Sequence, residues 1–223
     1  MNSAVIKKLI EILPTLYLNK VPPNYEYILF KSRELVKNLS NTEKIKLYQT
    51  QLEINDATDI IELCILIFNI WEKDYGFNKK DLLQKKEFIE IYLKDVIPSY
   101  NLKLAFDILE NIRDPTKYLG KYEILKDLIT DVLNLELISL NVIDKLIIDS
   151  YKNNSNYNIS KLITKRCKEE IFKIKESVRT SYAKEIAINS EKQLKLIVLN
   201  PDFLSNHVKT RVNVLKNSSY FYN

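Results

Sequence analysis

Apolar residues recur at intervals of three and four along almost the whole chain, which is the spacing of one face of an α-helix. The clearest stripe consists of Ile60, Ile61, Cys64, Ile65, Phe68 and Trp71. A second stripe consists of Leu102, Ala105, Phe106, Leu109 and Ile112. No Asn-Gly or Asp-Gly pair joins two alternating segments, so the usual hairpin signal is missing. We therefore predict an all-α fold.

Glycine is scarce, which excludes several classes of binding site. The 223 residues include only Gly76 and Gly120. Dinucleotide-binding loops and P-loops need several glycines at fixed spacing, because the backbone must approach the phosphates closely. Zinc clusters usually need four Cys or His ligands, whereas this chain has two Cys and one His. We predict no cofactor and no metal site.

Helix breakers divide the chain into short elements. Pro22, Pro23, Gly76, Pro98 and Pro115 interrupt the pattern, and Ser40 with Glu43 has the spacing of a capping box. We expect roughly 8–11 helices of ~10–18 residues with short connections. No repeat of ~34–45 residues keeps a common phase. This favours an irregular multi-helix bundle or a short α-solenoid.

An Asn-rich segment over residues 152–158 is the one low-complexity linker that we identify. Residues 160–223 carry 13 Lys and Arg against 6 Asp and Glu, whereas residues 1–159 carry 21 against 23. We predict a near-neutral to slightly acidic helical domain over 1–152. A basic C-terminal helical segment over 159–223 is expected to pack on it.

The pattern after the linker predicts one long helix over residues 160–188. Its apolar stripe consists of Ile163, Cys167, Ile171, Ile174, Val178 and Tyr182. Five cations fall on the opposite face, at ~100° per residue. These candidate residues for binding nucleic acid or an acidic partner are Lys161, Lys165, Lys168, Lys175 and Arg179.

Three interpretations of this basic face stay open. It could be an ordinary solvated face, because pairs such as Arg166 with Glu170 have the i,i+4 spacing that stabilises exposed helices. A straight basic ridge could also follow a phosphate backbone without reading bases. An acidic protein or a membrane surface would be attracted in the same way.

Catalytic signatures are weak. The single histidine, His207, has no carboxylate at a suitable spacing to orient it. Cys64 and Cys167 lie in apolar helical contexts that are typical of core residues. We predict that the chain is not an enzyme.

The chain ends in consecutive aromatics, Tyr220, Phe221 and Tyr222. They could contact a protein partner, or they could fold back on the chain's own helices.

We predict a non-enzymatic helical protein–protein interaction protein, such as an adaptor, a regulator or a subunit of a larger complex, which uses an apolar helical groove. The alternative is a nucleic-acid-binding protein that uses the basic face of the long C-terminal helix. No apolar segment approaches the ~20 residues of a membrane span, and the N-terminus lacks the pattern of a signal peptide. We therefore expect an intracellular protein of the cytoplasm or nucleus, without integral membrane association.

Overall fold

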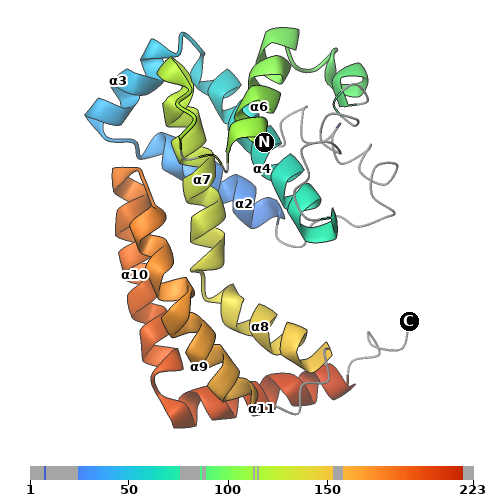
Figure 1. Cartoon of the computed structure of the whole chain (residues 1–223), viewed down its shortest axis with the longest axis vertical. Coiled ribbons are helices and arrows are strands. Elements are labelled where there is room, and N and C mark those ends of the chain that lie inside the picture. The colour runs from blue at the N-terminus through green and yellow to red at the C-terminus, as the bar shows by residue number, and fades with distance from the viewer. Residues whose placement is uncertain are drawn as a thin grey trace. The chain divides into compact units, whose positions relative to one another are not determined.

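A computed structural model describes residues 8, 25–75, 86, 89–112, 114, 116–152 and 158–217, the side chains of 25–28 and 69–75 excepted. Over these residues the chain forms helices and connecting turns and contains no strand, so the all-α prediction is confirmed (Figure 1). Among the described helices, none combines the length and the apolar character needed to cross a bilayer. The chain divides into two compact units, Met1–Val132 and Leu133–Asn223, and the division falls within one helix.

Several described helices of the first unit begin or end beside the predicted breakers Pro23, Gly76 and Pro98. The described helices of this unit are α2 (Tyr25–Lys37), α3 (Asn41–Gln49), α4 (Ile54–Tyr75), α6 (Ser99–Asn111), the 3-10 helix η1 (Gly120–Tyr122) and α7 (Glu123–Leu137), which extends past the division. Residues 89–93 are also helical. Gly120 has a left-handed φ of 61°, which suits a residue without a Cβ at the start of η1.

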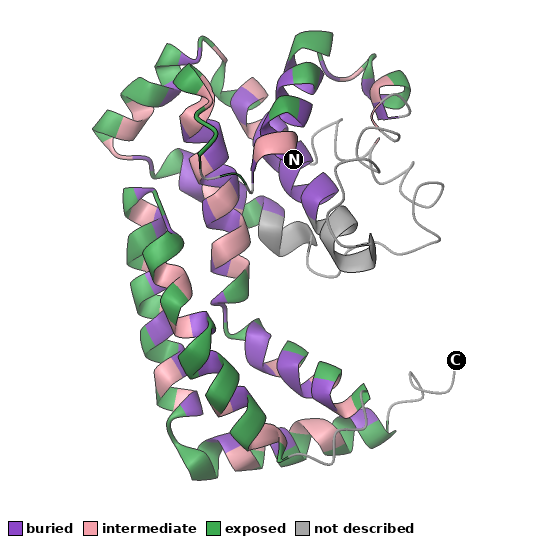
Figure 2. Ribbon diagram, in the orientation of Figure 1, coloured by how far each residue is buried: buried purple, intermediate pink, exposed green. Residues whose placement is uncertain are grey.

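Helix α4 provides the core of the first unit and packs against α2 and α6. Its residues from Ile60 to Phe68 are all buried (Figure 2). A helix that is apolar on every side must be enclosed by others, because exposing it would cost ~25 cal/mol per Å² of apolar surface. Cys64 lies within this run, and its thiol donates a hydrogen bond to the Ala105 carbonyl oxygen at 3.4 Å.

The buried run of α4 contains one charged side chain, Glu62, which is fully buried. Its carboxylate accepts hydrogen bonds from Arg33 of α2, from Nε at 2.6 Å and from Nη2 at 3.4 Å. Burial raises the pKa of Glu62 above its ordinary value, and the hydrogen bond and charge of Arg33 offset part of this increase. The pair therefore joins α2 to α4 at a site where an unpaired carboxylate would be costly.

Local hydrogen bonds set the helix ends that the sequence indicated. Ser40 and Glu43 form the predicted capping box of α3, in which the Ser40 backbone N–H donates to Glu43 Oε2 at 2.8 Å. Lys126 of α7 is buried and donates to the carbonyl oxygens of Asp114 and Lys117, at 3.0 and 2.7 Å. These bonds fasten the connection between α6 and η1 to the first turn of α7.

The second unit consists of α8 (Asn141–Lys152), α9 (Ile159–Glu169), the 3-10 helix η2 (Ile171–Ser177), α10 (Ser181–Val198) and α11 (Pro201–Asn217), together with the end of α7. Helix α11 packs against α8, α9 and α10 (Figure 1). The single histidine lies here: His207 Nε2 of α11 is 3.2 Å from Asp144 Oδ1 of α8. The predicted linker residues 153–157 lie outside the described residues, and α8, which precedes them, packs within the same unit as the helices that follow.

The prediction of one helix over 160–188 is wrong. Helix α9 ends at Glu169, η2 follows, and Val178 is extended, with φ −77° and ψ 136°. Helix α10 then continues through residues 188–191, where the sequence pattern indicated a break. Ile171 and Val178 are both buried, although they do not share one α-helix. Burial of an apolar stripe therefore does not require a continuous helix, and tertiary packing decides where the helix ends.

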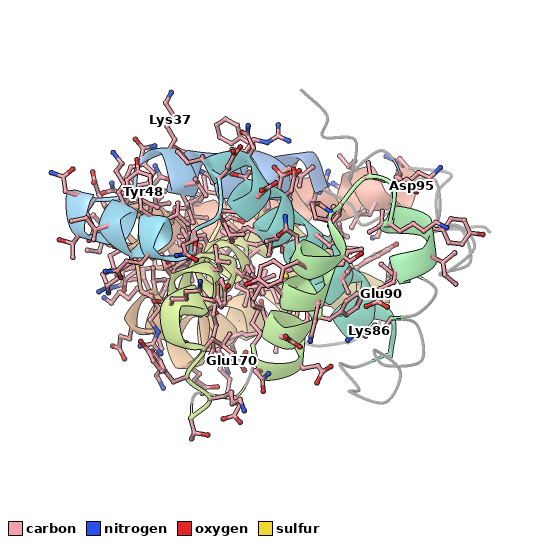
Figure 3. All side chains as sticks on the ribbon, turned by 90° about the horizontal axis from the view of Figure 1, so that it is seen from above. Lys37, Tyr48, Lys86, Glu90, Asp95 and Glu170 are labelled. Carbon is pink, nitrogen blue, oxygen red and sulfur yellow. The ribbon has the colours of Figure 1, made fainter. Side chains whose placement is uncertain are left out.

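We predict that Arg33→Ala destabilises the protein by about 2–4 kcal/mol, because Glu62 would remain buried without its cation and could relieve this only by taking up a proton. Urea unfolding followed by circular dichroism measures the change. Lys37→Ala is the matched control on the same helix: Lys37 is exposed and extends away from the ribbon (Figure 3), so its removal should change stability by less than about 0.5 kcal/mol. Equal effects of the two substitutions would contradict a structural role for the Arg33–Glu62 pair.

We also predict that neither thiol reacts in the native protein. Burial raises the pKa of Cys64, and it raises the pKa of Cys167 to about 11, against a smaller opposing effect of the Arg166 charge. Ellman's reagent at mildly alkaline pH should label both thiols in urea and neither in buffer. Rapid native labelling that is lost in Cys167→Ala would show that α9 opens readily.

Candidate functional site

A hollow that opens to solvent lies between η2 and α10 in the second unit and has a volume of about 680 Å³. Its described lining contains five cations, two carboxylates and two aliphatic side chains. These residues are Lys175, Glu176, Val178, Arg179, Lys184, Ile188, Glu191, Lys192 and Lys195. We call this feature the basic hollow.

The innermost charge of the basic hollow is a carboxylate held by two lysines. Glu191 of α10 is buried, with 7% of its side chain exposed. Lys175 of η2 approaches its two oxygens at 3.0 and 2.8 Å, and Lys195 approaches Oε1 at 2.9 Å. The ammonium group of Lys195 also lies 5.3 Å from the centre of the Phe172 ring. This cluster therefore ties η2 to α10.

The electrostatics of the cluster favour an ionised carboxylate. Burial by itself would raise the pKa of Glu191, but hydrogen bonds from Lys175 and Lys195 and their positive charges outweigh that effect and hold the pKa below its ordinary value. Glu191 cancels one of the two lysine charges, and with five cations against two carboxylates the lining of the hollow keeps a net positive charge.

The other cations lie at the rim. Arg179, Lys184 and Lys192 are exposed. Within the part of the chain that the structure describes, Lys184 and Lys192 make no ion pair. Ile188 lies on α10 between them in sequence and is 46% exposed, while Val178 is buried. The hollow thus offers exposed positive charge beside an exposed aliphatic side chain.

The structure separates the cations that the sequence placed on one helix face. Lys175 and Arg179 line the basic hollow. Lys161, Lys165 and Lys168 lie on α9, where all three are exposed, and they do not line it. Their spacing within α9 still places these three on one face. The predicted exposed pair forms as well, with Arg166 Nε 3.2 Å from Glu170 Oε2.

Sequence reasoning missed the contribution of α10 to the site. Lys184, Ile188, Glu191 and Lys195 follow one another at steps of four, three and four, which places them on one helix face. That spacing was available as a signal, but the helix predicted over residues 160–188 ended before Glu191 and Lys195. The candidate contacts Tyr220, Phe221 and Tyr222 lie outside the described residues.

No cluster of three or more potential metal ligands occurs among the side chains that the structure describes. Known protein families, curated proteins and solved structures provide no significant match to this chain. The basic hollow is therefore interpreted from its own geometry.

We predict that Lys175→Gln destabilises the protein by about 1–2 kcal/mol at neutral pH, because a buried carboxylate loses one of its two donors. The pKa of Glu191 is lowered on folding, so the stability that its charge contributes is present above the ordinary pKa of Glu and is lost as pH falls through the lower, folded value. The difference between variant and wild type should therefore shrink as pH falls below about 4. Urea midpoints measured across this pH range provide the test.

Lys192→Gln is the matched control, since Lys192 lines the same hollow but is exposed and makes no ion pair among the described residues. It should change stability by less than about 0.5 kcal/mol at every pH. A constant destabilisation by Lys175→Gln down to low pH would contradict the assignment of the effect to the charge of Glu191.

Proposed function

We propose that the chain is a non-enzymatic interaction protein that binds an acidic segment of another protein in the basic hollow. The observation that carries this proposal is the gathering of five cations around one hollow that also exposes Ile188. An acidic partner segment with an aliphatic residue would complement both features, because interfaces combine an apolar anchor with a charged rim. The described lining contains no Ser, Thr, Cys or His, and its inner lysines Lys175 and Lys195 are paired with Glu191.

The basic hollow differs from the apolar helical groove that we predicted from the sequence. Its lining contains two aliphatic residues and five cations, and we expect the charges to contribute mainly to the rate and selectivity of association. We place this activity inside the cell, in the cytoplasm or nucleus, as an adaptor, regulator or complex subunit.

The first unit supplies further surface suited to a protein partner. Tyr48, Tyr100 and Tyr118 are 61%, 57% and 75% exposed. The hydroxyl groups of Tyr100 and Tyr122 hydrogen bond to each other, and Lys121 lies 5.1 Å from the centre of the Tyr122 ring. Tyrosine is enriched at protein interfaces because it combines a large apolar ring with a polar tip.

A nucleic-acid partner remains the second candidate, and the observation in its favour is the α9 face. Lys161, Lys165 and Lys168 are exposed on two turns of one helix, and no ion pair engages them within the described residues. Such a row can contact phosphates and release counterions. The row is short, because α9 ends at Glu169.

We predict that a fluorescent peptide rich in Glu and Leu binds the wild-type chain, and that Lys184→Gln combined with Lys192→Gln weakens binding on the order of tenfold. Fluorescence anisotropy at fixed ionic strength measures the affinity. Lys161→Gln combined with Lys168→Gln makes the same change in net charge on α9, away from the hollow, and should weaken peptide binding by less than about twofold.

Duplex DNA and single-stranded RNA serve as competing probes in the same assay. Tight, steeply salt-dependent binding of either one, reduced by the α9 substitutions, would favour the second candidate. Absence of peptide binding to the wild type, or equal losses from the two double variants, would refute the proposed use of the basic hollow.

A further inference from the structure

The basic hollow already contains a carboxylate at the position where its cations converge. Glu191 receives both ammonium groups at 2.8–3.0 Å, one from η2 and one from α10. Two of the five lining cations are therefore directed at an internal anion, and an incoming ligand meets the rim cations first.

This arrangement discriminates between classes of anion. A phosphate or pyrophosphate group concentrates its charge in a small volume and binds best where several donors converge on it. In the basic hollow the converging donors are Lys175 and Lys195, and Glu191 occupies them. Glu191 is itself a buried side chain of a helix, so an incoming phosphate would have to compete with a permanently tethered carboxylate.

Separated carboxylates do not meet this competition at Lys184 and Lys192, which make no ion pair among the described residues. These two rim cations lie eight residues apart on α10. An acidic peptide distributes single charges along a chain, so it can reach separated cations without entering the inner position. The exposed Ile188 provides a contact for an aliphatic side chain that phosphate cannot use.

We propose that Glu191 is the specificity-determining residue of the basic hollow: it excludes phosphate-type ligands from the inner lysines and reserves the rim for an acidic protein segment. This inference rests on the proposed function for its partner, while its statement about phosphate can be tested separately.

The test compares Glu191→Gln with Glu176→Gln by isothermal titration with pyrophosphate. Glu176 is an exposed carboxylate in the same lining, so both substitutions add one unit of positive charge to the same hollow, and only the first releases the inner lysines. We expect Glu191→Gln to bind pyrophosphate at least about tenfold more tightly than wild type, and Glu176→Gln to gain less than about threefold. Equal gains in the two variants would overturn the inference, because they would reflect net charge alone.

Failures of the two proposals are distinguishable. If the wild type binds the acidic peptide but Glu191→Gln gains no pyrophosphate affinity, the specificity role is refuted and the proposed function stands. If the wild type does not bind the peptide while Glu191→Gln gains affinity for pyrophosphate, the proposed function is refuted and the exclusion of phosphate stands.

Folding is checked by thermal melts followed by circular dichroism. If Glu191→Gln alone does not fold, Lys175→Gln combined with Glu191→Gln removes one charge of each sign and leaves Lys195 without its carboxylate. This double variant should still bind pyrophosphate about threefold more tightly than wild type, because one inner lysine becomes accessible. No gain in that variant would also overturn the inference.

Discussion

Burial disfavours the ionised form of a carboxylate, so a buried carboxylate that stays ionised needs cations or hydrogen-bond donors beside it, and Glu191 imposes this requirement on the second unit. Lys175 satisfies it from η2, and the ion pair closes at 2.8 Å. In one continuous α-helix, residues 16 positions apart would lie about 24 Å apart along the axis. The chain must therefore turn back between Lys175 and Glu191, and the 3-10 segment followed by extended Val178 makes this reversal. The basic hollow is the space left open beside that reversal.

The elements of this fold could largely be read from the apolar period and the helix caps, but the reversal could not. Four residues of the predicted stripe, Ile163, Cys167, Ile171 and Val178, are buried, whereas Ile174 and Tyr182 are only partly buried. The same burial, however, is compatible with one helix or with two helices joined by a 3-10 turn. No Gly or Pro interrupts residues 160–188, so the usual breakers gave no signal. Ser177, Thr180 and Ser181 lie around Val178, and short polar residues of this kind favour helix ends. This preference is weak, so by itself it does not predict a break in a long apolar stripe.

Charge composition located the basic part of the chain but not the shape of its basic surface. The excess of cations after residue 160 indicated an anionic partner in general terms. A straight helix would have arranged Lys161, Lys165, Lys168 and Lys175 as a ridge. The break leaves the first three on α9 and turns Lys175 toward Glu191. The ion pair of Lys175 with Glu191 joins two separate helical segments. The spacing of residues along one helix does not predict such a contact.

The difference between a ridge and a hollow changes the class of partner that the charges favour. A ridge presents successive cations to a regularly charged polymer, and its affinity comes mainly from counterion release. The lining of the basic hollow instead combines cations with an exposed aliphatic side chain and an internal anion, so we expect both shape and charge to restrict any ligand. Glu191 cancels one of the two charges of Lys175 and Lys195, which lowers the total attraction for any anion, while Lys184 and Lys192 keep exposed positive charge at separated rim positions. We therefore propose that this surface loses affinity for small, concentrated anions and gains selectivity for an acidic chain that also carries an apolar residue.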